Sequence, residues 1–315
     1  MELNQLFYYV ILNLLKRKDK SLMEFNKFFY SRGVKKSIVI NIDELSFDQK
    51  SPIIILCHGH SRHKNDGLDI LSDNLVKNGF CTARFDFRGC SSLDSDRYEL
   101  YCATQWPEDL MSAISYVSTL PCVDKKRIGV AGISMGASTA VYVSGIDPRI
   151  KSTVSMSGIG NCYEWMKGVW NRNEGDFQYF LKILEKDDEI SAATGKSQLI
   201  HTLDMYHSSE KEKKDLQLDS FMNNDINAFV SLSSLRNMMS YRPIEKCGSI
   251  HHPIFFAHGD KDELVPFEES MQMYQAAASS VKKIKSYEGI EHNIPMDPNR
   301  YIVFEDISKW FQETL

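Results

Sequence analysis

The hydrophobic positions of the chain fall into short apolar runs that alternate with segments of helical spacing. Pro52-Ile53-Ile54-Ile55-Leu56-Cys57 is a continuous apolar run, the pattern of a strand buried on both faces of a parallel sheet. Further strands are predicted over 37–42, 80–87, 127–131, 150–156, 254–257 and 283–287, and helices over 66–77, 106–117, 137–142, 267–279 and 303–311. This alternation predicts an α/β fold with a doubly wound, mostly parallel sheet.

One stretch interrupts the alternation. Between Gly158 and about Ser249 the chain has only helix-like segments separated by polar, charged turns, and it is too long for a plain loop. We predict a helical cap inserted between two strands of the sheet. The predicted domains are an α/β core over 36–158 and 249–315, the cap over 159–248 and an N-terminal helical segment over 1–35.

The N-terminal segment contains an apolar run from Leu6 to Leu15, followed by Lys16-Arg17-Lys18. A secretory signal carries its positive charge before the apolar run, and a membrane span needs about 20 apolar residues. The pattern favours an amphipathic helix docked on the body of the protein. The alternative is a weak membrane contact, because basic residues flank the run. One strand, 37–42, is predicted before Pro52.

Composition narrows the class of protein. The chain of 315 residues is 43% hydrophobic and 25% charged, which is ordinary for a globular protein with a sizeable core. A net charge of −5 gives no electrostatic case for binding nucleic acid. Seven scattered cysteines without a Cys-x-x-Cys pair indicate a reduced, cytoplasmic setting and no zinc site. The sequence leaves open whether the protein is a monomer or a homodimer.

The pentapeptide Gly132-Ile133-Ser134-Met135-Gly136 stands between a predicted strand and a predicted helix. A serine at the tip of such a sharp turn needs small neighbours, since the backbone doubles back on itself, and the two glycines supply that room. The turn exposes the hydroxyl at the N-terminus of the new helix. Ser134 is therefore the candidate nucleophile.

An activated serine needs a base to take its proton and a third group to hold that base. Asp260 and Asp262 follow the predicted strand 254–257, and His292 lies in the loop after the next strand. Active-site residues gather at the carboxyl ends of the strands in open α/β sheets. His58 and His258 each end an apolar strand, and we interpret both as buried residues that fix loops.

The chain resembles the α/β-hydrolases, in the branch of prolyl-oligopeptidase-like, dienelactone-hydrolase-like and cinnamoyl-esterase-like enzymes. The resemblance covers roughly residues 50–158 and 240–315. It rests on His58-Gly59, the segment 86–92, the pentapeptide around Ser134, Asp147-Pro148-Arg149-Ile150 and the segment 253–266. Serine, aspartate and histidine follow one another in the order of that superfamily.

The resemblance also implies roles for individual residues. In such families the acid stands three residues after the glycine of a histidine–glycine pair and three before valine–proline, which is Asp262 rather than Asp260, and the base is His292. The backbone amides of Met135 and His60 are the implied oxyanion hole. The implied activity is a serine esterase without a metal or organic cofactor, acting on a small-molecule ester or thioester.

Four alternatives stay open. A thioesterase or an acyltransferase would use the same acyl-enzyme, a peptidase is less favoured because there is no propeller-sized N-terminal domain, and some α/β-hydrolase folds are non-catalytic binding proteins.

In the cap, Trp165, Trp170 and Met205 are candidate substrate contacts, although such side chains also serve as packing.

Overall fold

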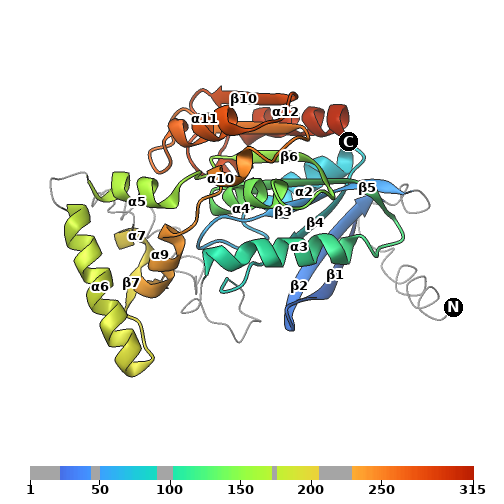
Figure 1. The fold of residues 1–315 in the computed structure, drawn as a ribbon. Helices are drawn as coiled ribbons and strands as arrows, with labels where there is room; N and C mark the ends of the chain where they lie inside the picture. Colours follow the sequence, from blue (N-terminus) through green and yellow to red (C-terminus); the bar gives the residue numbers. More distant parts are fainter. Residues whose placement is uncertain (1–21, 44–49, 91–101, 172–175, 206–228) are drawn as a thin grey trace.

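The computed structural model describes residues 22–43, 50–90, 102–171, 176–205 and 229–315, which build an eight-stranded sheet (Figure 1). Its strand order is β1-β2-β4-β3-β5-β6-β9-β10. The strands are β1 (Leu22–Ser31), β2 (Val34–Asp43), β3 (Ser51–Cys57), β4 (Cys81–Phe85), β5 (Val123–Ile133), β6 (Ile150–Met156), β9 (Ile254–Gly259) and β10 (Lys282–Tyr287). β2 pairs antiparallel with β1 and β4, and the pairings from β4 to β10 are parallel. The predicted doubly wound, mostly parallel sheet is confirmed.

Helices cover both faces of this sheet. They are α2 (Leu68–Lys77), α3 (Trp106–Val117), α4 (Met135–Ser144), α11 (Phe267–Ala276) and α12 (Arg300–Thr314), with short 3-10 turns at Ala103–Gln105 and Ile294–Met296. Alternate side chains of β3 point to opposite faces of the sheet. Ile54 and Leu56 pack with α2 and α12, whereas Ile53 and Ile55 pack with α3 and α4. Burial on both faces explains why β3 reads as an unbroken apolar run.

The N-terminal region differs from the prediction. A helical segment was expected over 1–35, but residues 22–31 form β1, which pairs along its whole length with β2. Phe25 and Phe29 of β1 are buried, while Phe28 and Tyr30 on the other face are 51% and 67% exposed. With aromatic rings on both faces, the strand lacks the alternation of apolar and polar residues that would have revealed it. Among the residues described before β3, two strands are therefore present rather than one.

The predicted helix at Leu6–Leu15 and its membrane contact lie outside the described residues. Within the part of the chain that is described, no helix combines the length and the hydrophobicity that crossing a bilayer requires.

The inserted segment leaves the sheet after β6 and returns to β9. Its described elements are α5 (Cys162–Trp170), α6 (Asp176–Thr194), β7 (Leu199–His201), α7 (Thr202–Met205), β8 (Phe229–Ser231), α9 (Leu232–Met239) and α10 (Ile244–Cys247). Most of them stand to one side of the sheet (Figure 1). The small antiparallel sheet of β7 and β8 was not predicted, because strands of three residues are too short to show a pattern.

The two ends of the insertion are joined to each other at a neck, residues 160–162 and 241–244. The amide of Cys162 donates to the carbonyl of Tyr241 (3.2 Å), and the amide of Ile244 donates to the carbonyl of Gly160 (3.0 Å). Beyond the neck, Cys247 of α10 packs with residues of α4, β9 and α11. By its packing α10 belongs to the body of the fold, although the prediction assigned it to the cap.

Candidate active site

Ser134 occupies the tip of a strained turn between β5 and α4. Its backbone has φ 55° and ψ −123°, a conformation that residues other than glycine rarely adopt. Two backbone bonds hold it there: its amide donates to the carbonyl of Met156 (2.9 Å), and its carbonyl accepts from the amide of Ser138 (2.9 Å). The first bond ties the turn to the end of β6, so the neighbouring strand stabilises the strained residue.

The glycines around Ser134 are required by close backbone contacts. A Cβ on Gly132 would lie 2.3 Å from the carbonyl oxygen of Gly136, and one on Gly136 would lie 2.3 Å from the carbonyl oxygen of Cys57. A Cβ on Gly59 would lie 3.2 Å from Cβ of Ser134. The turn therefore packs directly against the end of β3 and the loop that begins with His58-Gly59.

Asp262 and His292 form a hydrogen-bonded pair at the carboxyl ends of β9 and β10. Nδ1 of His292 lies 2.7 Å from Oδ2 of Asp262. The Asp262 side chain is 1% exposed and that of His292 is 19% exposed, so one end of the pair is enclosed and the other is open. Gly259 permits the approach of the two loops, because a Cβ there would lie 2.1 Å from the carbonyl oxygen of Ile290.

The carboxylate of Asp262 is surrounded by donors. Oδ1 accepts from the amides of Leu264 (3.0 Å) and Val265 (2.8 Å), and Oδ2 also lies 3.2 Å from Nε2 of His258. Burial alone would raise the pKa of Asp262, but the charge of a protonated His292, the two histidine contacts and the amide of Val265 outweigh it. The pKa of Asp262 consequently lies well below its usual range, and the group is a carboxylate at neutral pH.

Asp260, the alternative acid, is engaged elsewhere. Its side chain accepts a hydrogen bond from the backbone amide of Gly289 (2.7 Å), and the residue is exposed. It therefore fastens the turn after β10 and does not contact His292. The structure therefore brings Asp262, and not Asp260, to His292.

Ser134 stands at the same edge of the sheet as this pair, since all three residues follow parallel strands at their carboxyl ends. The residue is partly exposed, and its hydroxyl has no hydrogen-bond partner among the described residues. The structure thus joins Asp262 to His292 and leaves His292 unbonded to Ser134. Such contacts are often long before a substrate binds.

The two amides predicted for the oxyanion hole belong to Met135 and His60. Met135 is the first residue of α4, and the first amides of a helix have no partner within it. His60 follows Gly59, whose position against Ser134 is described above. The His60 side chain is 8% exposed and its Nδ1 lies 2.9 Å from Oγ of Ser61. Burial, with a smaller effect from His58, lowers the pKa of His60 to about 4, so its ring is neutral near pH 7.

His58 holds the loop that carries His60. Its Nε2 accepts from the amide of Phe87 (2.9 Å), so the proton lies on Nδ1, which donates to the carbonyl of Gly59 (2.7 Å). Burial lowers the pKa of His58 to about 4. The neutral, doubly bonded ring agrees with the interpretation of His58 as a residue that fixes a loop.

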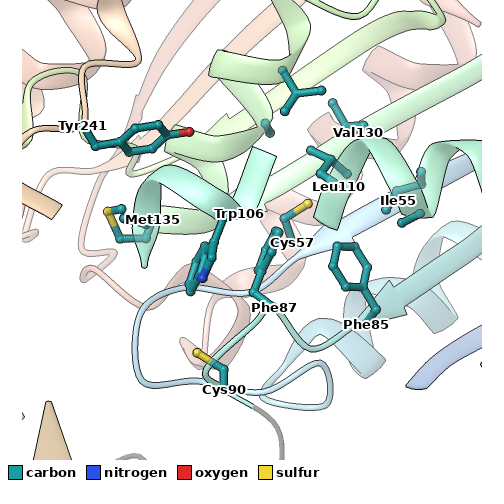
Figure 2. Close-up of a cluster of buried hydrophobic side chains, with 14 of the residues drawn as sticks. Ile55, Cys57, Phe85, Phe87, Cys90, Trp106, Leu110, Val130, Met135 and Tyr241 are labelled. Atoms are coloured by element: carbon teal, nitrogen blue, oxygen red, sulfur yellow. The ribbon is translucent and has the colours of Figure 1, made fainter. Parts of the chain in front are cut away.

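Met135 also belongs to the hydrophobic cluster beneath the site. Figure 2 shows it at one edge of a group that includes Phe87, Trp106 and Cys57. The rings of Phe87 and Trp106 are stacked, with centroids 4.2 Å apart. This packing fixes the start of α4 and hence the direction of the Met135 amide.

The three cap candidates fall in different places. Nε1 of Trp165 in α5 donates to the carbonyl of Leu264 (2.9 Å), so the structure brings Trp165 to the turn that carries Asp262. Trp170 instead stacks on Phe180 of α6, with ring centroids 4.3 Å apart. Met205 is fully buried in the hydrophobic cluster that runs from the body into the insertion.

The sequence analysis missed one residue at the contact between the insertion and the body of the fold. The buried carboxylate of Glu269 in α11 accepts from the amides of Gly160 (2.8 Å) and Asn161 (3.1 Å), where the insertion begins. Burial raises the pKa of Glu269, and the two amides partly offset the effect. No motif marks such a contact, because its partners are backbone groups more than a hundred residues away.

Comparison with known proteins places the chain in a family. The family model described as "Serine aminopeptidase, S33" matches residues 48–299. An Escherichia coli protein named "Uncharacterized 31.7 kDa protein in traX-finO intergenic region" is 27% identical over 235 residues, 75% of this chain and 81% of that protein. Caffeoylshikimate esterase of Arabidopsis thaliana is 35% identical over 72 residues, 22% of each chain.

A solved structure supports the same grouping at the level of the fold. Est1E from Butyrivibrio proteoclasticus, with ferulic acid bound, aligns with a TM-score of 0.68 and 16% identity over 91% of this chain and 98% of Est1E. Because the family model spans most of the chain, including both strand ends that carry the acid–base pair, the protein belongs to the S33 serine aminopeptidase family of α/β-hydrolases.

Proposed function

We propose that this hydrolase cleaves a carboxylic ester through an acyl-enzyme on Ser134. The observation that carries the proposal is the 2.7 Å bond between Asp262 and His292 at the sheet edge where the strained turn presents Ser134. A serine held in this conformation, at the same sheet edge as a histidine that is itself held by a carboxylate, is the arrangement expected of a nucleophile and its base.

The bond to Asp262 selects the tautomer of the base. A carboxylate only accepts hydrogen bonds, so Nδ1 of His292 must carry the proton, and in the neutral ring Nε2 is then an acceptor. Nε2 takes the proton of the Ser134 hydroxyl as its oxygen attacks the carbonyl carbon. The carbonyl oxygen becomes an oxyanion, which the amides of Met135 and His60 stabilise.

The remaining steps reuse the same groups. His292 returns the proton to the leaving alcohol, and the acyl group stays on Ser134. Water then attacks the acyl-enzyme while His292 accepts its proton, and His292 returns that proton to Oγ of Ser134 as the carboxylic acid departs. Asp262 remains ionised throughout, because four donors surround it, and it stabilises the imidazolium formed in each half-reaction.

The inserted segment would select the acyl group. Trp165 supports this role, since it joins α5 to the turn that carries Asp262, and we assign the same role to Trp170 and Met205. The relatives that act on or bind phenylpropanoid compounds, caffeoylshikimate esterase and Est1E with ferulic acid, make aromatic acyl esters the first class to test.

The test is a screen of p-nitrophenyl esters of increasing acyl length, hydroxycinnamoyl esters, acyl thioesters and aminoacyl amides, with Ser134→Ala as the control. We expect ester turnover, its loss by at least about 10³-fold in Ser134→Ala, and labelling of the wild type alone by a fluorophosphonate. Turnover confined to aminoacyl amides would make the protein a peptidase, as the family description suggests. Full activity in a folded Ser134→Ala variant would disprove the proposed acyl-enzyme on Ser134.

A further inference from the structure

His258 is an enclosed polar side chain next to Asp262, and the mechanism above counts it only among the four donors around that carboxylate. It is fully buried at the end of β9. Its Nε2 lies 2.8 Å from the carbonyl oxygen of Val265 and 3.2 Å from Oδ2 of Asp262. Both neighbours are acceptors, so Nε2 carries a proton and faces the carboxylate.

The other ring nitrogen is also engaged. Nδ1 of His258 lies 2.8 Å from Oγ of Ser270 in α11. The ring thus connects the strand, the turn over 262–265 and the helix that follows. Oδ2 of Asp262 lies between two imidazole groups, His258 on the enclosed side and His292 on the open side.

We infer that His258 is a positioning residue for the reaction, holding Asp262 so that Oδ2 points at Nδ1 of His292. The inference rests on the proposed function. The amides of Leu264 and Val265 bind only Oδ1, so the position of Oδ2, which changes by rotation about the Cβ–Cγ bond, depends on the groups around that second oxygen. A donor on the far side of Oδ2 restricts this rotation. It also draws charge from Oδ2, which moderates how strongly Asp262 favours the imidazolium form of His292.

The alternative is a purely structural role, in which His258 only packs β9 against α11. It predicts that the two polar atoms of the ring matter equally, or not at all. The positioning role predicts that only Nε2 matters for catalysis, because Nδ1 faces Ser270 and not the carboxylate.

Two variants distinguish the positioning role from the structural role. His258→Gln places an amide nitrogen near the position of Nε2, whereas His258→Asn reaches only as far as Nδ1. On p-nitrophenyl acetate we expect kcat to fall about 10-fold in His258→Asn with little change in KM, and to recover most of that loss in His258→Gln. Ser270→Ala, which removes only the Nδ1 contact, should stay within about twofold of the wild type.

A second readout does not depend on turnover. Titration of the His292 ring by NMR, with its signal assigned from a His292→Gln variant, should give a higher midpoint in His258→Asn than in the wild type and His258→Gln. Equal kcat and equal midpoints in the two His258 variants, with thermal unfolding confirming that both are folded, would overturn the inference. Ser134→Ala measured alongside keeps the outcomes distinct: its activity tests the proposed function, and the His258 pair tests the positioning role.

Discussion

At the scale of single residues, the site depends on which of two neighbouring carboxylates reaches His292. Asp262 contacts it at 2.7 Å, while Asp260 binds the amide of Gly289. We predict that Asp262→Asn lowers kcat by about 10³-fold or more, because the amide cannot stabilise the imidazolium and favours the wrong tautomer. Asp260→Asn should change kcat by less than about fivefold, as only a turn is loosened. Steady-state kinetics on one small ester decide between them, and a reversed order would reassign the acid.

The same carboxylate makes a pH-dependent contribution to stability. Its pKa is lowered in the folded protein, so the contribution is complete above the unfolded value of about 3.9 and is lost as the pH falls below it. We predict that Asp262→Asn unfolds in urea with a free energy lower by on the order of 2 kcal/mol near pH 7. The difference should narrow between about pH 5 and pH 3. A difference that stays constant over this range would contradict the assignment.

At the scale of elements, the turn between β5 and α4 tolerates no side chain at its first glycine. Gly132→Ala would bring a Cβ to within 2.3 Å of the carbonyl oxygen of Gly136. This oxygen belongs to the backbone, so it cannot move aside without distorting the turn. We expect a loss of about 3 kcal/mol in the free energy of unfolding, with activity lost as the turn opens. Gly168 in α5 is the matched control: a Cβ there meets nothing within 4 Å, so Gly168→Ala should stabilise the helix by about 0.5–1 kcal/mol. Denaturant unfolding of the two variants tests the pair.

Helices and strands with an unambiguous pattern of apolar residues could be predicted from the sequence. Features that depend on contacts between residues far apart in the chain could not. β3, α3 and β6 appear in the structure within a residue of their predicted bounds, because each has an unambiguous apolar pattern. β1 was missed, since Phe28 and Tyr30 disguise its alternation. Likewise the spacing of a motif indicated Asp262 and His292, but the contacts of His258 and Glu269 are made across the fold, where sequence spacing carries no signal.

At the scale of the whole molecule, the insertion and the body meet where α5 touches the turn that carries Asp262. Trp165→Phe keeps the apolar packing but removes the bond to the Leu264 carbonyl. We predict at least about fivefold greater loss of kcat/KM for a bulky aromatic ester than for an acetyl ester, because only the bulky acyl group needs the insertion in place. Trp310→Phe, in α12 on the body of the fold, is the control and should affect the two substrates alike. Equal losses on both esters in Trp165→Phe would mean that the insertion lies away from the bound acyl group.

The neck gives the insertion a modular character. Its entering and leaving chains are hydrogen-bonded to each other, and they connect β6 and β9, which are neighbours in the sheet. A segment whose ends already lie together can be lengthened, shortened or exchanged by recombination without disturbing the register of any strand. Ser134, Asp262 and His292 all lie outside the exchanged segment. Under the proposed function, descendants of one ancestral gene could exchange this single stretch of DNA and so change the acyl group they accept, while the residues proposed for catalysis stay the same.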